Sequence, residues 1–98
     1  MERRRLSDVE IDRGLSDLDG WELRGQRLHR EYRFRDFPSA MTFMNTVAVE
    51  AEALDHHPNW NNVHARVEIE LWTHDRGGVT EFDLELARRC ARIAAILA

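Results

Sequence analysis

The strongest periodic signal lies in the middle of the chain. After Pro38, apolar residues recur at steps of three and four, at Phe43, Met44, Val47, Ala48, Ala51 and Leu54. This spacing places them on one face of a helix, and a proline suits the first helical turn because no backbone N–H is needed there. The pattern therefore predicts a helix from about Pro38 to about Asp55.

Two further helices are predicted near the ends of the chain. Ser7 and Glu10 have the spacing of a capping box, so a short helix should begin there and end between Gly14 and Leu18. Near the other end, Thr80 follows a Gly-Gly break and can cap a helix that runs to the C-terminus. The apolar positions of that last helix are Phe82, Leu86, Ala87, Cys90, Ala94 and Leu97.

Alternating apolar and polar residues predict strands in two regions. Residues 21–23 and 27–37 flank a Gly-Gln pair and read as a hairpin of two half-buried strands, with Arg30 as a misfit on the apolar parity. The second region follows Pro58 and is long enough for one bent strand or two short ones. Its apolar parity consists of Val63, Ala65, Val67, Ile69 and Leu71.

The order of these elements favours an α+β fold in a single domain over residues 1–98, with an antiparallel sheet and helices on its apolar face. No strand–helix–strand alternation is long enough for a doubly wound sheet. A chain of 98 residues has a small core, so self-association is expected to bury more surface.

Composition narrows the function. The net charge of −4 argues against direct nucleic-acid binding, and the Arg3–Arg5 run reads as a solvated tail. No apolar stretch approaches a membrane span of about 18 residues, and no apolar run follows the basic N-terminus as in a secretory signal, so a cytoplasmic protein is expected. The single cysteine, Cys90, falls in a helical apolar pattern and is expected to be a small buried residue.

Four of the five histidines lie between residues 56 and 74, at His56, His57, His64 and His74. The first two end the central helix just before Pro58, and the last follows Thr73 where the extended region ends. Side chains at segment ends often meet in a cleft. Several imidazoles allow one ring to accept a proton while another donates, so general acid–base chemistry is indicated.

Other interpretations of these residues stay open. His56 alone could be a favourable charge at a helix end, and Asp83 could either orient a histidine or cap the last helix. Trp60 and Trp72 could stack on a flat heterocycle or pack in the core. His29 lies on a polar parity and is expected to be solvated. A metal site is disfavoured because no helical His pair or cysteine pair is present.

Together these motifs resemble the pterin-4a-carbinolamine dehydratase family. The resemblance is carried by His56-His57-Pro58-Asn59-Trp60, Trp72-Thr73-His74, Gly77-Gly78-Val79-Thr80 and Asp83, with Glu52 four residues before the histidine pair. Tyr32 to Phe37 and the central helix through Phe43 extend it more loosely. One position departs from the family pattern, because His64 stands where an aromatic residue is usual, and altered substrate affinity is expected there.

The resemblance implies a four-stranded antiparallel sheet with three helices on one face, associated as a homodimer or homotetramer through the sheet. It also implies dehydration of a 4a-hydroxytetrahydropterin, such as 4a-hydroxytetrahydrobiopterin, to the quinonoid dihydropterin in tetrahydropterin recycling. Paired imidazoles suffice for this chemistry without metal or organic cofactor. The alternative is a non-catalytic protein-binding scaffold, since family members also act as a transcriptional dimerisation cofactor or as Rubisco-assembly chaperones.

The hypothesis therefore divides the site residues into two groups. His57 and His74 would form the acid–base set, and His56 would bind and orient the pterin, although the sequence leaves the order of these three roles open. The remaining substrate-binding candidates are Glu52, Pro58, Trp60, His64, Thr73 and Asp83.

Overall fold

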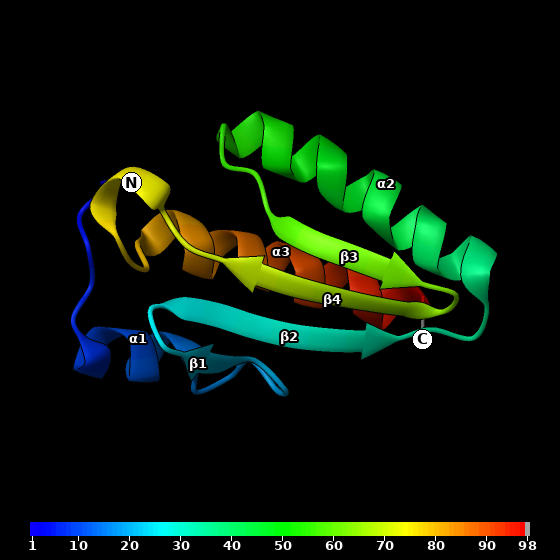
Figure 1. The fold of residues 1–98 in the computed structure, drawn as a ribbon, viewed down its shortest axis with the longest axis horizontal. Coiled ribbons are helices and arrows are strands. Elements are labelled where there is room, and N and C mark those ends of the chain that lie inside the picture. Colours follow the sequence, from blue (N-terminus) through cyan, green and yellow to red (C-terminus); the bar gives the residue numbers. More distant parts are fainter. Residues whose placement is uncertain (98) are drawn as a thin grey trace.

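The computed structural model describes residues 1–97 and confirms the predicted α+β fold (Figure 1). Four antiparallel strands form one open sheet in the order β1-β2-β4-β3. The strands are β1 (Glu22–Arg24), β2 (Arg27–Arg33), β3 (Asn59–Val63) and β4 (Arg66–Leu71). The helices are α1 (Asp8–Leu15), α2 (Phe37–Leu54) and α3 (Glu81–Leu97), with a 3₁₀ turn η1 (His74–Arg76) before α3. No helix in this part of the chain is long and apolar enough to cross a membrane.

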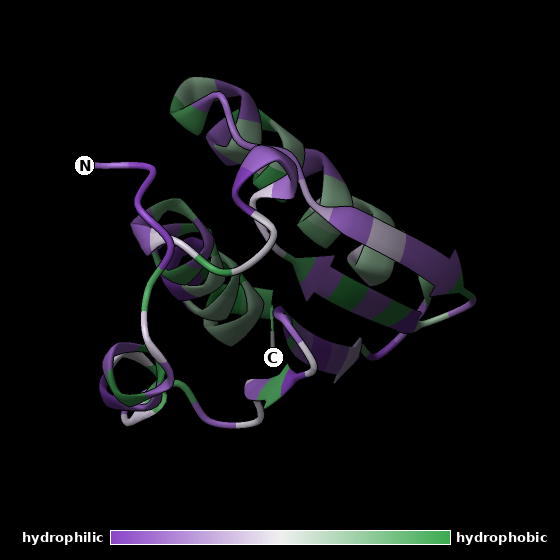
Figure 2. Ribbon diagram, turned by 60° about the vertical axis from the view of Figure 1, so that its left-hand side comes forward, coloured by the Kyte–Doolittle hydropathy of each residue, from purple (hydrophilic) through white to green (hydrophobic). Residues whose placement is uncertain are grey.

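The core lies between one face of the sheet and the helices α2 and α3, which pack against each other (Figure 1). Figure 2 shows apolar and polar residues alternating along the strands, so only one face is apolar. The core residues that are almost fully buried include Leu28, Phe43, Val47, Val67, Ile69, Leu71, Leu86 and Cys90. Cys90 is fully buried, which confirms its packing role, and this burial raises the pKa of the thiol to about 12.

Capping residues set where the first two helices begin: the predicted Ser7 box for α1, and Asp36, which the sequence analysis did not single out, for α2. The Ser7 hydroxyl accepts from the Glu10 N–H at 3.2 Å, and the Glu10 carboxylate accepts from the Ser7 N–H at 2.9 Å. Hydrogen bonds from Arg4 and Ser7 lower the pKa of the Glu10 carboxyl to about 2. At the start of α2, the Asp36 carboxylate accepts from the Ser39 N–H at 2.8 Å. All three predicted helices are therefore present within about a residue of their expected starts.

The second extended region consists of two strands joined by a turn at His64 and Ala65. His64 has a positive φ of 53°, which reverses the chain. After this turn the alternation restarts, so Val63 pairs with Arg66 on the face away from the helices and is half exposed. The prediction that Val63 shares the apolar parity of Val67 was wrong, because a tight turn does not preserve strand parity.

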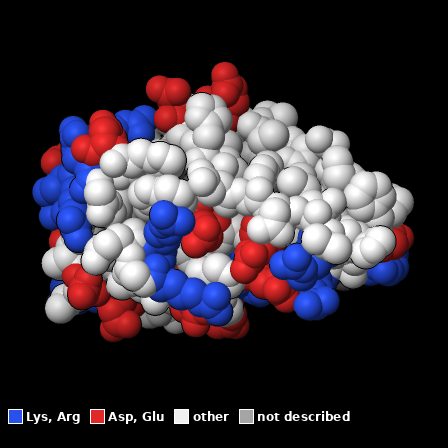
Figure 3. Space-filling view, viewed as in Figure 1, with Lys and Arg blue, Asp and Glu red and all other residues white. Residues whose placement is uncertain are grey.

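The opposite face of the sheet is charged. In Figure 3, acidic and basic side chains lie close together over the sheet, whereas the surface over α2 carries few charges. His29 lies on this charged face and its Nε2 is 2.9 Å from a Glu68 carboxylate oxygen. This contact is the main cause that lowers the pKa of the Glu68 carboxyl. His29 is 7% exposed, so the expectation that it is solvated was wrong, because flanking strands cover its ring.

Arg30, the misfit of the sequence pattern, lies at the margin of the core. Its guanidinium carbon is 4.0 Å from the centre of the Tyr32 ring, and its Nε donates to the Asp19 carbonyl at 3.1 Å. Because its guanidinium is stacked and hydrogen-bonded, Arg30 can lie on the face of β2 that points towards the helices.

An aromatic cluster anchors α2 to the sheet and can be tested by mutation. The Phe43 ring centre lies 5.2 Å from that of Tyr32 and 4.8 Å from that of Phe34, and Phe43 is fully buried. Phe43→Ala should lower the free energy of unfolding by about 3 to 5 kcal/mol in urea denaturation. Val49→Ala, at an exposed position of the same helix, should change it by less than about 0.5 kcal/mol. Equal effects of the two substitutions would contradict this packing.

Candidate active site

The C-terminal end of α2 directs the histidine pair. The Asp55 N–H donates to the Glu52 carbonyl and the His56 N–H to the Ala51 carbonyl, both at 3.0 Å. Asp55 takes the left-handed conformation with φ of 51°, a position that helices usually give to glycine. This reversal turns His56 back towards the core. Pro58 then favours extended backbone at His57, which leads into β3.

His56 meets Asp83 inside the protein. The His56 side chain is 7% exposed and Asp83 is fully buried, and the His56 Nε2 hydrogen-bonds the Asp83 Oδ1. The second carboxylate oxygen of Asp83 accepts from the Thr80 N–H at 2.9 Å, at the beginning of α3. Both interpretations of Asp83 therefore hold at once: it caps α3 and it orients a histidine.

Two buried hydroxyls complete the surroundings of Asp83. The Thr73 hydroxyl donates to the Asp83 Oδ2 at 3.0 Å and lies 2.8 Å from the Thr80 hydroxyl. Because Thr73 gives its one proton to Asp83, Thr80 must donate to Thr73. The Thr80 oxygen then accepts from the Phe82 N–H at 3.3 Å. Every buried side-chain polar atom of the described chain has a hydrogen-bond partner, this cluster included.

His57 and His74 lie above this cluster at the rim of a cleft of about 300 Å³. The His57 Nε2 is 2.9 Å from the Glu52 Oε1, and both side chains are exposed. The His74 ring stacks on Trp72, with ring centres 4.3 Å apart and planes 5° apart. The residues that line the cleft are Arg3, Asp55, His56, His57, Pro58, Asn59, Trp72, Thr73, His74 and Asp75.

The structure thus brings most of the candidates together. His56, His57, Pro58, Thr73 and His74 line the cleft, Glu52 contacts His57, and Asp83 lies beneath. Thr73 and His74 reach the cleft because the Thr73 N–H bonds the Gly78 carbonyl at 2.8 Å and closes the loop that contains η1.

Trp60 and His64 are not part of this cleft. Trp60 pairs with Ile69 in the sheet and packs against the core. His64 follows β3, whereas Pro58 precedes it, so the whole five-residue strand, about 17 Å long, lies between them. Within one chain, an imidazole at position 64 does not reach a ligand held by His57 and His74.

Sequence reasoning missed the contribution of Arg3 to the cleft. Arg3 lines it, and its guanidinium carbon is 4.0 Å from the centre of the Phe82 ring. The expectation that Arg3–Arg5 forms a solvated tail was wrong for Arg3, since it contacts residues more than 50 positions away. No local pattern signals such a contact.

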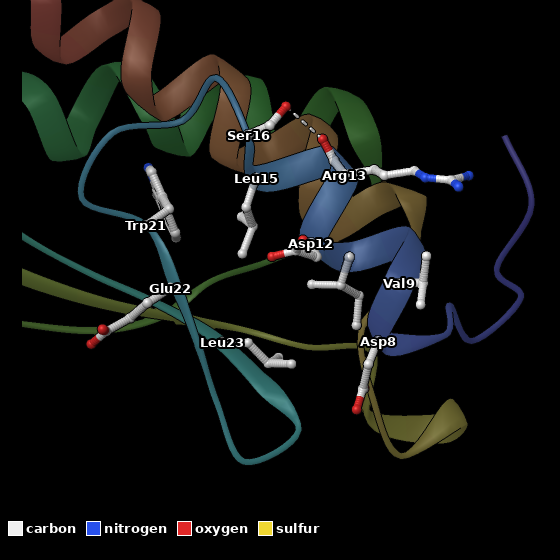
Figure 4. Close-up of a pocket in the computed structure, with 10 residues that line it drawn as sticks. Asp8, Val9, Asp12, Arg13, Leu15, Ser16, Trp21, Glu22 and Leu23 are labelled. Carbon is white, nitrogen blue, oxygen red and sulfur yellow. Dashed lines mark hydrogen bonds between the residues drawn. The ribbon is translucent and has the colours of Figure 1, made fainter.

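A larger hollow lies elsewhere, between α1 and β1 (Figure 4). Its volume is about 810 Å³, and Figure 4 shows apolar side chains such as Leu15 and Leu23 facing it, with Asp8 and Glu22 at its margin. No histidine or cysteine lines it, so it lacks a group that exchanges protons near neutral pH. Within residues 1–97, no three His, Cys, Asp or Glu side chains are placed to hold a metal ion.

Comparison with known proteins identifies the family of the chain. The family model described as Pterin 4 alpha carbinolamine dehydratase matches residues 4–93, which include every residue of the cleft except Arg3. The chain belongs to this family. Among its relatives, the protein called "Putative pterin-4-alpha-carbinolamine dehydratase" in Chelativorans sp. (strain BNC1) is 46% identical over 97% of this chain and 99% of its own length. A relative with the same designation in Solibacter usitatus is 45% identical over 93% of this chain and 96% of its own length.

Two solved structures share the fold of this dehydratase-family chain. The transcriptional coactivator/pterin dehydratase from Brucella melitensis has a TM-score of 0.89 and 43% identity, covering 93% of this chain and 99% of that one. A pterin dehydratase-like protein identified as a RuBisCO assembly factor in the alpha-carboxysome has a TM-score of 0.63 and 21% identity, covering 76% and 86% of the two chains. The second likeness shows the fold alone.

Replacing Asp83 tests the buried cluster. Asp83→Asn places an amide NH₂ among three hydrogen-bond donors, so at least one donor is left unsatisfied, and the free energy of unfolding should fall by about 3 kcal/mol in urea denaturation. Asp75→Asn is the matched control, because Asp75 is exposed and pairs only with Arg76. A loss no larger than that of the control would contradict the role given to Asp83.

Proposed function

We propose that the protein dehydrates a 4a-hydroxytetrahydropterin to the quinonoid dihydropterin, with His57 and His74 as the acid–base pair. One observation carries this proposal: two exposed imidazoles stand at the rim of a cleft whose floor is a third, buried imidazole bound to a carboxylate. Membership in the dehydratase family supports the substrate class.

The reaction asks for two proton transfers. The C–O bond at the bridgehead carbon breaks, and the departing hydroxide takes a proton to leave as water. The adjacent ring nitrogen loses its proton, and its electron pair forms the C=N bond. One acid and one base balance the reaction, and imidazoles serve both roles near neutral pH. The protein must also hold the flat pterin ring between them.

The contact of His57 with Glu52 favours one role for this histidine, and the other role then falls to His74. An ionised Glu52 carboxylate only accepts hydrogen bonds, so the His57 Nε2 that faces it carries a proton and the Nδ1 keeps its lone pair. His57 is therefore the base in this proposal, and Glu52 stabilises the imidazolium that forms, as the carboxylate does in a catalytic triad. His74, stacked on Trp72, is the acid.

Replacing either rim histidine tests the proposal. In stopped-flow absorbance measurements on a freshly generated 4a-hydroxytetrahydropterin, chelator-treated protein should accelerate dehydration, and His57→Ala or His74→Ala should lower kcat by about 10² to 10⁴-fold. His64→Asn is the control, because it removes an imidazole at the far end of β3 and asparagine tolerates the positive φ there. Its rate should equal that of the unmodified protein.

Three results would contradict the proposal. Full activity of both rim variants would show that His57 and His74 are not the acid–base pair. Loss of activity in His64→Asn would place the substrate outside the histidine cleft. Failure of the folded, unmodified protein to accelerate the reaction would instead favour a protein-binding role on this scaffold.

A further inference from the structure

The backbone around Arg3 is fixed at two points. The Arg76 Nε donates to the Arg3 carbonyl at 2.8 Å, and the Leu6 N–H donates to the Val79 carbonyl at 2.8 Å. The Leu6 side chain is buried in the core. These contacts tie the N-terminal segment to the loop between β4 and α3, so that the Arg3 side chain enters the histidine cleft.

The Arg3 guanidinium makes four contacts around the cleft, one of which is the ion pair between its Nη2 and the Asp55 Oδ2 at 4.0 Å. It stacks over the Phe82 ring at 4.0 Å, its Nη2 donates to the Asp55 carbonyl at 3.0 Å, and its Nη1 lies 3.3 Å from the His56 Nδ1. Its side chain is 32% exposed. Since the Asp55 carbonyl and the Phe82 ring belong to the ends of α2 and α3, the guanidinium bridges the two helices at the floor of the cleft.

The chemistry of these groups decides where the His56 proton lies. A guanidinium has donors only, so the His56 Nδ1 that faces it must offer a lone pair. The other ring nitrogen faces Asp83, whose carboxylate accepts hydrogen bonds, so Nε2 must carry the proton. Both ends of the ring require the same neutral tautomer.

We propose that Arg3 is a positioning residue that holds His56 in this single tautomer, with the proton on Nε2 and the lone pair on Nδ1. A second proton on Nδ1 would point an N–H at the N–H of Arg3 and set two cations side by side. Nδ1 of His56 therefore keeps its lone pair while Arg3 is in place, and the acid of the reaction is assigned to the rim. The catalytic part of this inference rests on the proposed dehydration.

Long-range ¹H–¹⁵N correlation spectra of the ¹⁵N-labelled full chain at pH 7 test the tautomer directly. The unmodified protein should show His56 protonated at Nε2 and unprotonated at Nδ1. In Arg3→Ala, a proton on the His56 Nδ1 should become detectable, because the guanidinium that donates to this nitrogen is gone. Arg3→Lys should keep the original pattern, since an ammonium also has only donors. Both variants should fold, because the bonds that anchor the segment use backbone atoms of Arg3 and Leu6.

Arg4→Ala is the matched control, because the neighbouring Arg4 pairs with Glu10 outside the cleft and its removal should leave the His56 spectrum unchanged. A proton on Nδ1 in the unmodified protein, or an unchanged spectrum in Arg3→Ala, would overturn the inference.

Turnover separates this inference from the proposed function. Arg3→Ala should slow dehydration by about 10²-fold and Arg3→Lys should recover most of the rate. The expected spectra in a protein that does not dehydrate pterins would refute the proposed function and leave the tautomer assignment standing. Dehydration by a protein whose His56 carries its proton on Nδ1 would refute the role of Arg3 alone.

Discussion

The buried carboxylate of Asp83 is the constraint on which the rest of the site depends. A carboxylate removed from water is costly unless hydrogen-bond donors surround it. Here the donors come from three separate parts of the chain: the Thr80 N–H at the beginning of α3, the Thr73 hydroxyl after β4, and the His56 ring after α2. Satisfying one buried charge thus brings together the three segment ends that form the cleft.

This constraint divides the cleft into a fixed floor and an accessible rim. Both ring nitrogens of His56 have partners, in Asp83 and Arg3, so its ring is held in place. His57 and His74 are exposed, and each keeps at least one ring nitrogen available to water or a ligand. A fixed floor that positions a flat ring and a rim that exchanges protons match the two needs of the proposed dehydration.

The sequence predicted the parts of this architecture that arise from local patterns. Helical spacing, caps and strand alternation fixed the elements, and the clustering of histidines at segment ends identified the cleft. Three features escaped because they depend on contacts distant in sequence or on a single turn. The turn at His64 moved Val63 to the polar face, cross-strand carboxylates covered His29, and Arg3 reached a helix end more than 50 residues away.

The most direct test of the account is whether the histidine cleft, rather than the larger α1–β1 hollow, binds a pterin. A 7,8-dihydropterin, which lacks the labile hydroxyl, should be titrated into ¹⁵N-labelled protein while the backbone and ring resonances are followed. The account predicts shifts at His57, Trp72 and His74 and none at Leu15 or Leu23. Shifts confined to residues of the α1–β1 hollow would contradict it. The absence of any shift at ligand concentrations that saturate the pterin sites of related dehydratases would contradict it as well.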